Sequence, residues 1–366
     1  MSETGTIGEA LIAQGISRRS LLKYTGYLAS ILALPPMASR AMADALASAK
    51  RQSVIWLSFQ ECTGCTESLT RSFNPTIEDM IFNLISLDYQ ETLMASAGTA
   101  AEEAMQAART ANKGKYVLVV DGSVATGAGG VYSTNAGKSN LETLKEVAAD
   151  AMAVLSVGTC AAFGGIPMAK PNPTGAVPVS EIITDKPVIN ISGCPPIPEA
   201  IAGTVAYIIT FGKLPDLDHL NRPKAFFGDS IHDRCYRRPF YDKGQFAKSF
   251  DDEGARNGWC LYEVGCKGPV TYNACATLKW NGGVSFPIQS GHGCLGCSEP
   301  GFWDRGGLYK PLSAAVMGNR EIIGGAAVAG VAAGAASVAL ARKRRAAAVA
   351  AQAAAPVAVG TEEKKP

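Results

Sequence analysis

Ten cysteines constrain this chain more than any other feature, because all of them lie between Cys62 and Cys297. Neither end of the 366-residue chain carries one, so we expect a working body in the middle and a different role for each end. The chain is 47% hydrophobic, which is enough apolar material to bury a large core. Its net charge of +2 excludes the strong positive field that gathers nucleic acid.

The first half of the body, residues 50–215, has the pattern of an open α/β fold. Apolar runs predict buried strands at residues 53–59, 116–120, 152–157 and 187–191, with a weaker one at 81–87. Helical periodicity predicts helices at residues 99–110, 141–152 and 198–209. Strands that alternate with helices predict a flavodoxin-like open parallel sheet, and we call this part the sheet half.

Four cysteines of the sheet half follow predicted strands. Cys62 and Cys65 follow the first strand, Cys160 follows the strand at 152–157, and Cys194 follows the strand at 187–191. Because the carboxyl ends of parallel strands meet at one edge, the four thiols are expected to converge. Four thiolates suit either a zinc ion or an iron–sulfur cluster. A thioredoxin-like redox pair and disulfide bonds are the alternatives.

The second half of the body, residues 216–312, is predicted to be an irregular metal-binding domain, and we call it the cluster half. Its candidate ligands are His232, Cys235, Cys260, Cys266, Cys275, Cys294 and Cys297. Seven candidate ligands are more than one metal site needs. Because the region has few strand or helix signals, bound metal is expected to supply much of its order. With the first four cysteines they divide into two sets of four and one of three. Three metal centres predict a chain of redox centres. The sequence contains no set of residues typical of a catalytic site.

The amino-terminal residues 1–49 have the pattern of an export signal. Arg18 and Arg19 directly precede a modest apolar run at 24–34, and small residues follow at 41–47. This order predicts a twin-arginine signal with cleavage near residues 43–49, and hence the twin-arginine export machinery as a partner. The other interpretation is a basic turn before a short amphipathic helix.

The carboxy-terminal residues 322–341 carry no charge and end at a run of four basic residues, 342–345. A helix of this length spans about 30 Å, so a single transmembrane helix is predicted. A cytoplasmic basic flank would place residues 50–320 on the periplasmic side of the inner membrane. A buried or interfacial helix is the alternative. The low-complexity tail at 346–366 is predicted to be disordered.

The motifs of the body resemble the small subunit of nickel–iron hydrogenases over nearly all of residues 54–309. The matching stretches include ECTGCTES at 61–68, GTCAAFGG at 158–165, PNPTGA at 171–176, GCPP at 193–196, IHDRC at 231–235 and SGHGCLGC at 290–297. These motifs are long and occur in the family's order, which makes the resemblance specific.

The resemblance implies three clusters and assigns every cysteine. It implies a proximal [4Fe–4S] cluster on Cys62, Cys65, Cys160 and Cys194, a distal [4Fe–4S] cluster on His232, Cys235, Cys260 and Cys266, and a medial cluster on Cys275, Cys294 and Cys297. Pro287 stands where some relatives have a fourth medial thiol, so the medial cluster is expected to be [3Fe–4S]. Position 64 is glycine and residues 131–135 contain no cysteine, which implies an ordinary proximal cluster and oxygen sensitivity.

The resemblance also implies a function and partners. The chain is expected to relay electrons from H2 oxidation, which occurs at the Ni–Fe centre of a large subunit, to a membrane cytochrome b or a similar quinone-linked acceptor. No residue of this chain is expected to be catalytic. The rival hypotheses are a membrane-tethered periplasmic binding module rich in disulfides and a relative of the cluster-binding subunit of respiratory complex I.

Overall fold

The computed structural model describes residues 6–13, 15–32, 34–304 and 308–312, all of which belong to one unit, residues 1–312. The predicted transmembrane helix at 322–341 and the predicted disordered tail at 346–366 lie outside the described residues. Among the helices that are described, none combines the length and the apolar character needed to cross a bilayer.

Five parallel strands form the central sheet, in the order β2-β1-β3-β7-β9. Their bounds are β1 Gln52–Ser58, β2 Ile85–Gln90, β3 Val117–Asp121, β7 Ala153–Val157 and β9 Val188–Ile191. In chain order this is the 2-1-3-4-5 arrangement of flavodoxin-type sheets, so the predicted parallel α/β fold is confirmed. The carboxyl ends of all five strands therefore lie at one edge of the sheet.

The strand predicted at 81–87, the weakest of the five, begins four residues later in the structure. Met80–Leu84 forms a single-turn π-helix, η1, and β2 begins only at Ile85. Met80 and Leu84 are both buried in the core, and their spacing of four residues brings them to the same side of a helical turn. A short apolar run fits a buried turn as well as a strand, so its composition alone does not distinguish the two.

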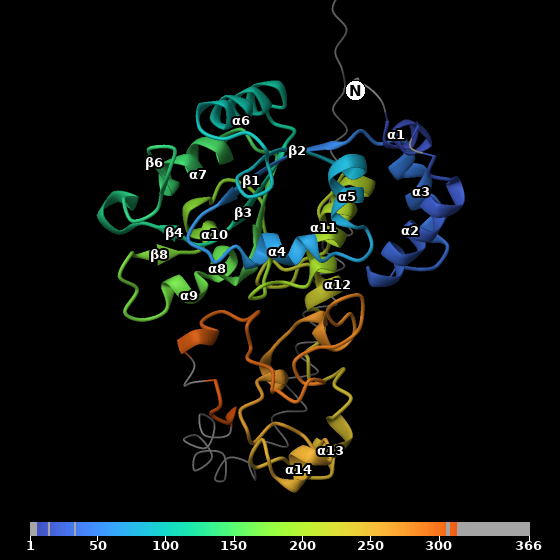
Figure 1. The fold of residues 1–366 in the computed structure, drawn as a ribbon, viewed down its shortest axis with the longest axis vertical. Coiled ribbons are helices and arrows are strands. Elements are labelled where there is room, and N and C mark those ends of the chain that lie inside the picture. Colours follow the sequence, from blue (N-terminus) through green and yellow to red (C-terminus); the bar gives the residue numbers. More distant parts are fainter. Residues whose placement is uncertain (1–5, 14, 33, 305–307, 313–366) are drawn as a thin grey trace, which may run out of the picture. The chain divides into compact units, whose positions relative to one another are not determined.

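Alternate residues of β1, β3, β7 and β9 supply two separate cores. Val54 and Trp56 of β1 belong to one core, and Ile55 and Leu57 belong to the other. The second core is closed by α6 (Thr99–Ala111), α7 (Asn140–Ala149) and α10 (Val179–Ile182), and the first by α11 (Pro198–Phe211) with the amino-terminal helices. Figure 1 shows the sheet between these two layers.

The residues predicted to be an export signal form three helices on the α11 side. These are α1 (Ile7–Ala13), α2 (Arg18–Ile31) and α3 (Ala38–Ser48). The Ser17 hydroxyl accepts a hydrogen bond from the Ser20 N–H at 3.2 Å and so caps α2, which places the two arginines in its first turn. Leu28, Met42 and Leu46 are completely buried in the same core as α11. In the full chain this segment is therefore packed on the body, while its cleavage stays a prediction.

Shorter elements surround the strand ends. They are α4 Gly64–Thr70, α5 Ile77–Asp79, β4 Val124–Ala125, η2 Gly127–Gly130, β5 Thr134–Asn135, β6 Lys138–Ser139, α8 Gly158–Phe163, α9 Gly165–Met168 and β8 Ala176–Val177. β4 pairs with β8, and β5 with β6, each antiparallel. α4 follows β1 and α8 follows β7, so both helices begin at the edge to which the cysteines were predicted to come.

The cluster half is irregular, as predicted. Its elements have three to five residues each: α12 Lys224–Phe227, α13 Arg238–Asp242, α14 Glu253–Arg256, η3 Gly268–Val270, η4 Ala274–Ala276 and η5 Phe302–Asp304. Its small core consists of Ile231, Ala247, Leu261, Val264, Cys266, Phe286 and Ile288. Loops rather than regular elements therefore position its side chains.

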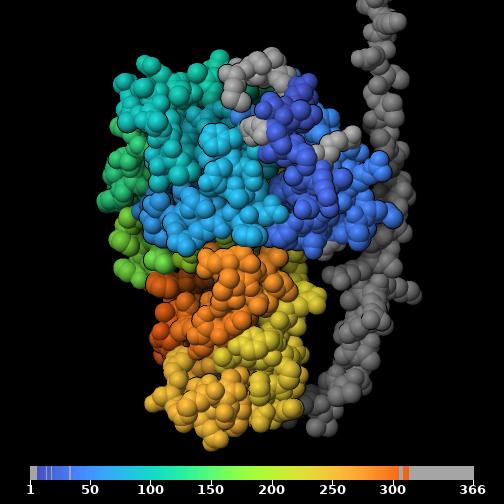
Figure 2. Space-filling view, turned by 45° about the vertical axis from the view of Figure 1, so that its right-hand side comes forward, coloured from blue at the N-terminus to red at the C-terminus, as the bar shows by residue number. Residues whose placement is uncertain are grey.

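Specific contacts join the two halves. The Ser192 hydroxyl, just after β9, donates to the Ser298 carbonyl at 2.8 Å. A Cβ on Gly282 would lie 3.2 Å from the Phe73 ring, so the loop at 282 lies against the segment after α4. Figure 2 shows residues of the 270–290 region directly adjoining residues of the 60–80 region.

Candidate functional site

The four cysteines of the sheet half meet at the carboxyl edge, as predicted. Cys65 lies in the first turn of α4 and Cys160 in α8, while Cys62 and Cys194 lie in the loops after β1 and β9. Burial raises the pKa of the Cys65 thiol, and the nearby Asp121 carboxylate and the thiols of the other three cysteines raise it further. Because the thiols of Cys62, Cys160 and Cys194 all raise the pKa of Cys65, the four thiols occupy one site.

Two glycines make room for these thiols. Gly158 has φ +87°, and a Cβ there would collide with the Cys65 sulfur. Gly165 has φ +55°, and a Cβ there would lie 2.7 Å from the Cys160 sulfur. A side chain at either position would enter the space beside a thiol, and both backbone conformations favour glycine. A cradle of bare backbone around four thiols fits an iron–sulfur cluster.

The predicted distal ligands line one hollow of the cluster half. His232, Cys235, Cys260 and Cys266 surround a space of about 280 Å³ together with Arg237, Arg238, Leu261, Gly268 and Ile288. Burial lowers the pKa of His232 and the Arg238 guanidinium lowers it further, which favours the neutral imidazole that can ligate metal. The edge of its ring meets the Tyr241 ring with centroids 4.5 Å apart. The structure therefore brings these four residues together.

The predicted medial residues also come together. Burial raises the pKa of Cys275, and the Cys297 thiol adds to that effect. The pKa of Cys294 is raised by burial and then by Cys266 and Cys297. The Cys275 thiol donates a hydrogen bond to the Asn273 side-chain oxygen at 3.3 Å. Pro287 is exposed, and the [3Fe–4S] assignment that rests on it stays a prediction.

The medial set lies between the other two. The Cys297 thiol is close enough to Cys194 to raise its pKa, and the Thr159 hydroxyl, next to Cys160, donates to the Cys297 carbonyl, so the sheet-half set adjoins the medial set. The peptide N–H of Cys294 donates to the Cys266 sulfur at 3.3 Å, which links the medial set to the distal set. The three sets therefore follow one another through direct contacts between their own ligand residues.

The state of the cysteines bears on the alternatives left open by the sequence. All ten lie within the described residues, and none of them forms a disulfide there. Within the residues that the structure describes, no three His, Cys, Asp or Glu side chains are arranged around the position of a single metal ion.

Acidic residues that the sequence analysis did not single out lie beside the sheet-half cysteines. Asp121 ends β3 and is fully buried, and its carboxylate accepts a hydrogen bond from the Thr66 hydroxyl at 3.2 Å. Burial, with a contribution from Asp121, raises the pKa of Glu61 to about 7 and that of Glu91 to about 7. Asp121 is the last residue of β3, and Glu91 directly follows β2. A position at the carboxyl end of a strand is the sequence signal that could have identified both residues.

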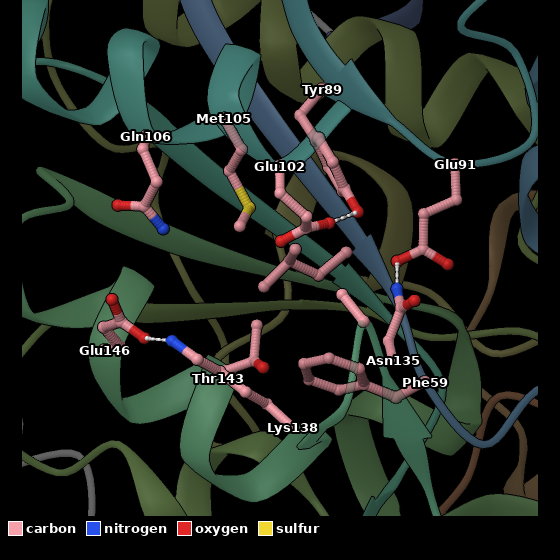
Figure 3. A pocket seen from close by; sticks show the side chains of 12 residues that line it. Phe59, Tyr89, Glu91, Glu102, Met105, Gln106, Asn135, Lys138, Thr143 and Glu146 are labelled. Atoms are coloured by element: carbon pink, nitrogen blue, oxygen red, sulfur yellow. Dashed lines mark hydrogen bonds and ion pairs between the residues drawn. The ribbon is translucent and has the colours of Figure 1, made fainter. Parts of the chain in front are cut away.

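Glu91 also lies at a hollow of about 360 Å³ on the α6–α7 side of the sheet, shown in Figure 3. Its carboxylate accepts a hydrogen bond from the Asn135 side-chain amide, while the Tyr89 hydroxyl donates to Glu102 at 2.9 Å. A carboxyl group with a pKa near 7 can bind or release a proton at neutral pH. Glu91, held by Asn135, is therefore a protonatable group beside the sheet.

Two family models match successive parts of the chain. Residues 62–208 match the family "NADH ubiquinone oxidoreductase, 20 Kd subunit", and residues 227–310 match the carboxy-terminal family of the "NiFe/NiFeSe hydrogenase small subunit". The first match covers much of the sheet half and the second most of the cluster half. A hydrogenase-specific model therefore matches the region that holds the distal and medial residues.

Similar proteins of known function and structure agree with that match. The uptake hydrogenase small subunit of Rhizobium leguminosarum bv. viciae is 51% identical over 86% of this chain and 87% of its own length. The hydrogenase-1 small chain of Escherichia coli K12 is 50% identical over 85% of this chain and 83% of its own length. A chain of the [NiFeSe] hydrogenase from Desulfovibrio vulgaris Hildenborough superposes with a TM-score of 0.66 at 40% identity, over 71% of this chain and 98% of that one.

Proposed function

Because the chain belongs to the family of nickel–iron hydrogenase small subunits, we propose that it carries electrons away from H2 oxidation in a partner large subunit. The reaction in that subunit releases two protons and two electrons from each H2. When bound, iron–sulfur clusters take up and give up electrons one at a time. Three such clusters held by this chain would lead the electrons to a membrane acceptor.

The order of the three ligand sets is the observation that carries this proposal. The Cys194 thiol lies near the thiol of Cys297, and the Thr159 hydroxyl, beside Cys160, donates to the Cys297 carbonyl. The Cys294 N–H donates to the Cys266 sulfur. A module that bound metal only for stability would have no need for its sites to touch in sequence. An electron path needs that continuity, because each centre must lie near the next.

The residues of this chain also control water and charge along the path. Cys65 and Cys266 are buried, and the Gly268 N–H adds a second donor to the Cys266 sulfur at 3.5 Å. Exclusion of water and hydrogen bonds to sulfur are two of the means by which proteins set the potential of iron–sulfur centres. His232 contributes an uncharged ligand to the distal set, unlike a thiolate.

The proposal includes the location and the partners predicted from the ends of the chain. The twin-arginine segment would direct the folded protein across the inner membrane, and a helix at 322–341 would anchor it on the periplasmic side. A membrane cytochrome b or a similar quinone-linked protein would then accept electrons from the distal set. The support for these points is the sequence pattern of residues 17–34 and 322–345.

Metal analysis of the anaerobically purified complex with its large subunit tests the proposal. Two [4Fe–4S] clusters and one [3Fe–4S] cluster predict about eleven irons per chain, with the EPR signal of an oxidised [3Fe–4S] centre. Pro287→Cys is the informative variant, because a fourth medial thiolate should remove that signal and add about one iron. Negligible iron in the wild-type complex would contradict the proposal.

Electron exit is tested separately by turnover. Cys62→Ser should abolish H2-dependent dye reduction while the large subunit retains its nickel. Thr63→Ser, at the adjacent residue, is the matched control and should retain activity. Full turnover of the Cys62→Ser complex would show that electrons leave by another way.

A further inference from the structure

Helix α11 is largely buried, and the amino-terminal segment covers part of it. A Cβ on Gly203 would lie 2.8 Å from the Phe226 ring of α12 and 3.3 Å from the Ile31 Cδ1 atom of α2. The pKa of Tyr27, also in α2, is raised by burial and then by the Glu199 carboxylate. Glu199 and Gly203 are four residues apart on one side of α11, and further steps of three and four residues add Ala206 and Thr210 to that side. We call this stripe the α11 face.

The packing around the amino-terminal segment leaves polar groups and surface unmatched. Among the described residues, the buried hydroxyls of Tyr24 in α2 and Thr210 in α11 have no hydrogen-bond partner. Beside the segment, an open groove runs between residues 11–24 and residues 74–84. A permanent core partner would be expected to pair such buried hydroxyls.

We propose that the α11 face is shared: it is covered by residues 7–48 in the full chain and by the hydrogenase large subunit in the assembled enzyme. The two occupants would exclude each other. This inference rests on the proposed function, which supplies the large subunit as a partner. It goes further because it assigns a surface to that partner and gives the amino-terminal segment a second role.

The position of the face favours the large subunit as its occupant. α11 begins at Pro198, four residues after Cys194, and it packs against α4, which carries Cys65. The face therefore continues from the edge that holds the proximal ligands, the first stop for electrons from that partner. Ala206 is small, so a partner helix can approach the backbone there closely. Once residues 7–48 leave, the buried surface beneath them needs a new cover.

One consequence concerns the twin-arginine motif. Ser17 caps α2, and Arg18 and Arg19 form its first turn, so the motif is part of the docked segment. Binding of the large subunit would displace α2 and free the motif.

Competition for the face is measured by titrating the full chain with purified large subunit. Leu28→Asp places a charge where Leu28 is completely buried and should undock the segment. If the segment is displaced only about a tenth of the time in the wild type, the variant should bind about tenfold more tightly. Ile12→Asp is the control, because Ile12 is 71% exposed, and its affinity should equal that of the wild type.

Hydrogen exchange at residues 18–48 reports docking independently of affinity. Fast exchange in Leu28→Asp with unchanged affinity would overturn the competition and leave the proposed function intact. Ala206→Arg should weaken binding of the large subunit, and unchanged affinity in a folded Ala206→Arg chain would also overturn it. If the wild type and all variants fail to bind the large subunit, the pairing itself is wrong.

Discussion

The sheet half and the cluster half reach their order by different means. Both sides of the sheet are packed, and residues such as Ile55, Leu118 and Leu155 have no exposed surface. The cluster half has a core of seven residues, and one of them is the candidate ligand Cys266. Apolar burial is worth about 25 cal/mol per Å², so the first half can be stable without metal and the second cannot easily be.

This difference indicates that the candidate ligands of the cluster half are also its structural supports. Polar contacts near Cys297 help to join the two halves: the Thr159 hydroxyl donates to the Cys297 carbonyl and Ser192 to the Ser298 carbonyl. Phe226 and Phe227 add apolar contacts with the core of the sheet half. The folded sheet half thus offers a platform to a region that we expect iron to complete. Loss of iron should therefore affect the two halves unequally.

Omission of iron should produce the largest effect. We expect the chain expressed without iron to lose amide protection throughout residues 228–300, because binding of metal supplies folding free energy there, while β1, β3 and β7 stay protected. Hydrogen exchange followed by mass spectrometry measures both halves in one sample. Equal protection, or equal loss, in the two halves would contradict the comparison.

The contact that joins the turn 218–222 to the Cys297 loop should give the next largest effect. Arg222 is 1% exposed and forms ion pairs with Asp218 at 2.8 Å and Glu299 at 2.9 Å. Arg222→Met leaves two carboxylates without their partner, so the free energy of unfolding should fall by about 4 kcal/mol. Denaturant titration of the iron-loaded protein measures this, with the surface pair variant Arg71→Met as the control. A change below about 1 kcal/mol would show that the ion pairs do not support the loop.

A matched pair of leucines compares the two cores directly. Leu118→Ala in β3 should lower the free energy of unfolding by about 3 kcal/mol whether or not iron is present, because its core is complete without metal. Leu261→Ala, next to Cys260, should show a comparable loss only in the iron-loaded protein. The comparison fails if Leu261→Ala destabilises the iron-free protein as strongly.

The smallest expected effect concerns pH and the protonatable group beside the sheet. The pKa of Glu91 is raised to about 7 by burial and by Asp121, so the folded state favours the protonated carboxyl. Stability should therefore fall as the pH rises from about 4.5 through 7, and Glu91→Gln should remove that part of the dependence. Since the carboxyl keeps solvent contact, the gain at pH 8 should be about 1 kcal/mol. Thermal unfolding of both forms between pH 5 and pH 8 tests this.

The sheet and the proximal site could be predicted because short-range signals determine them. Four of the strands could be recognised as apolar runs in the sequence. Because parallel strands end at one edge of a sheet, their order brings Cys62, Cys65, Cys160 and Cys194 together. The placement of η1 could not be predicted, since a short apolar run such as Met80–Leu84 fits a buried turn as well as a strand. Neither could the packing of α2, because an apolar run does not reveal what covers it.

The division of the other ligands required the fold or the family resemblance. Cys266 lines the hollow with His232, whereas Cys275, only nine residues later, contacts Cys297. Spacing gives no sign of that separation, because irregular loops determine it. Glu61, Glu91 and Asp121 were missed for a similar reason, since their raised pKa values depend on burial and on one another.

The peptide donor that links the medial and distal ligand sets has a consequence for how such a protein can evolve. The Cys294 N–H group belongs to the main chain, so an exchange of side chains does not remove it. Hydrogen bonds to sulfur help to set the reduction potential of an iron–sulfur centre. Point mutation can replace a ligand or adjust the side chains around His232. The contribution of this peptide donor, by contrast, is inherited with the path of the backbone.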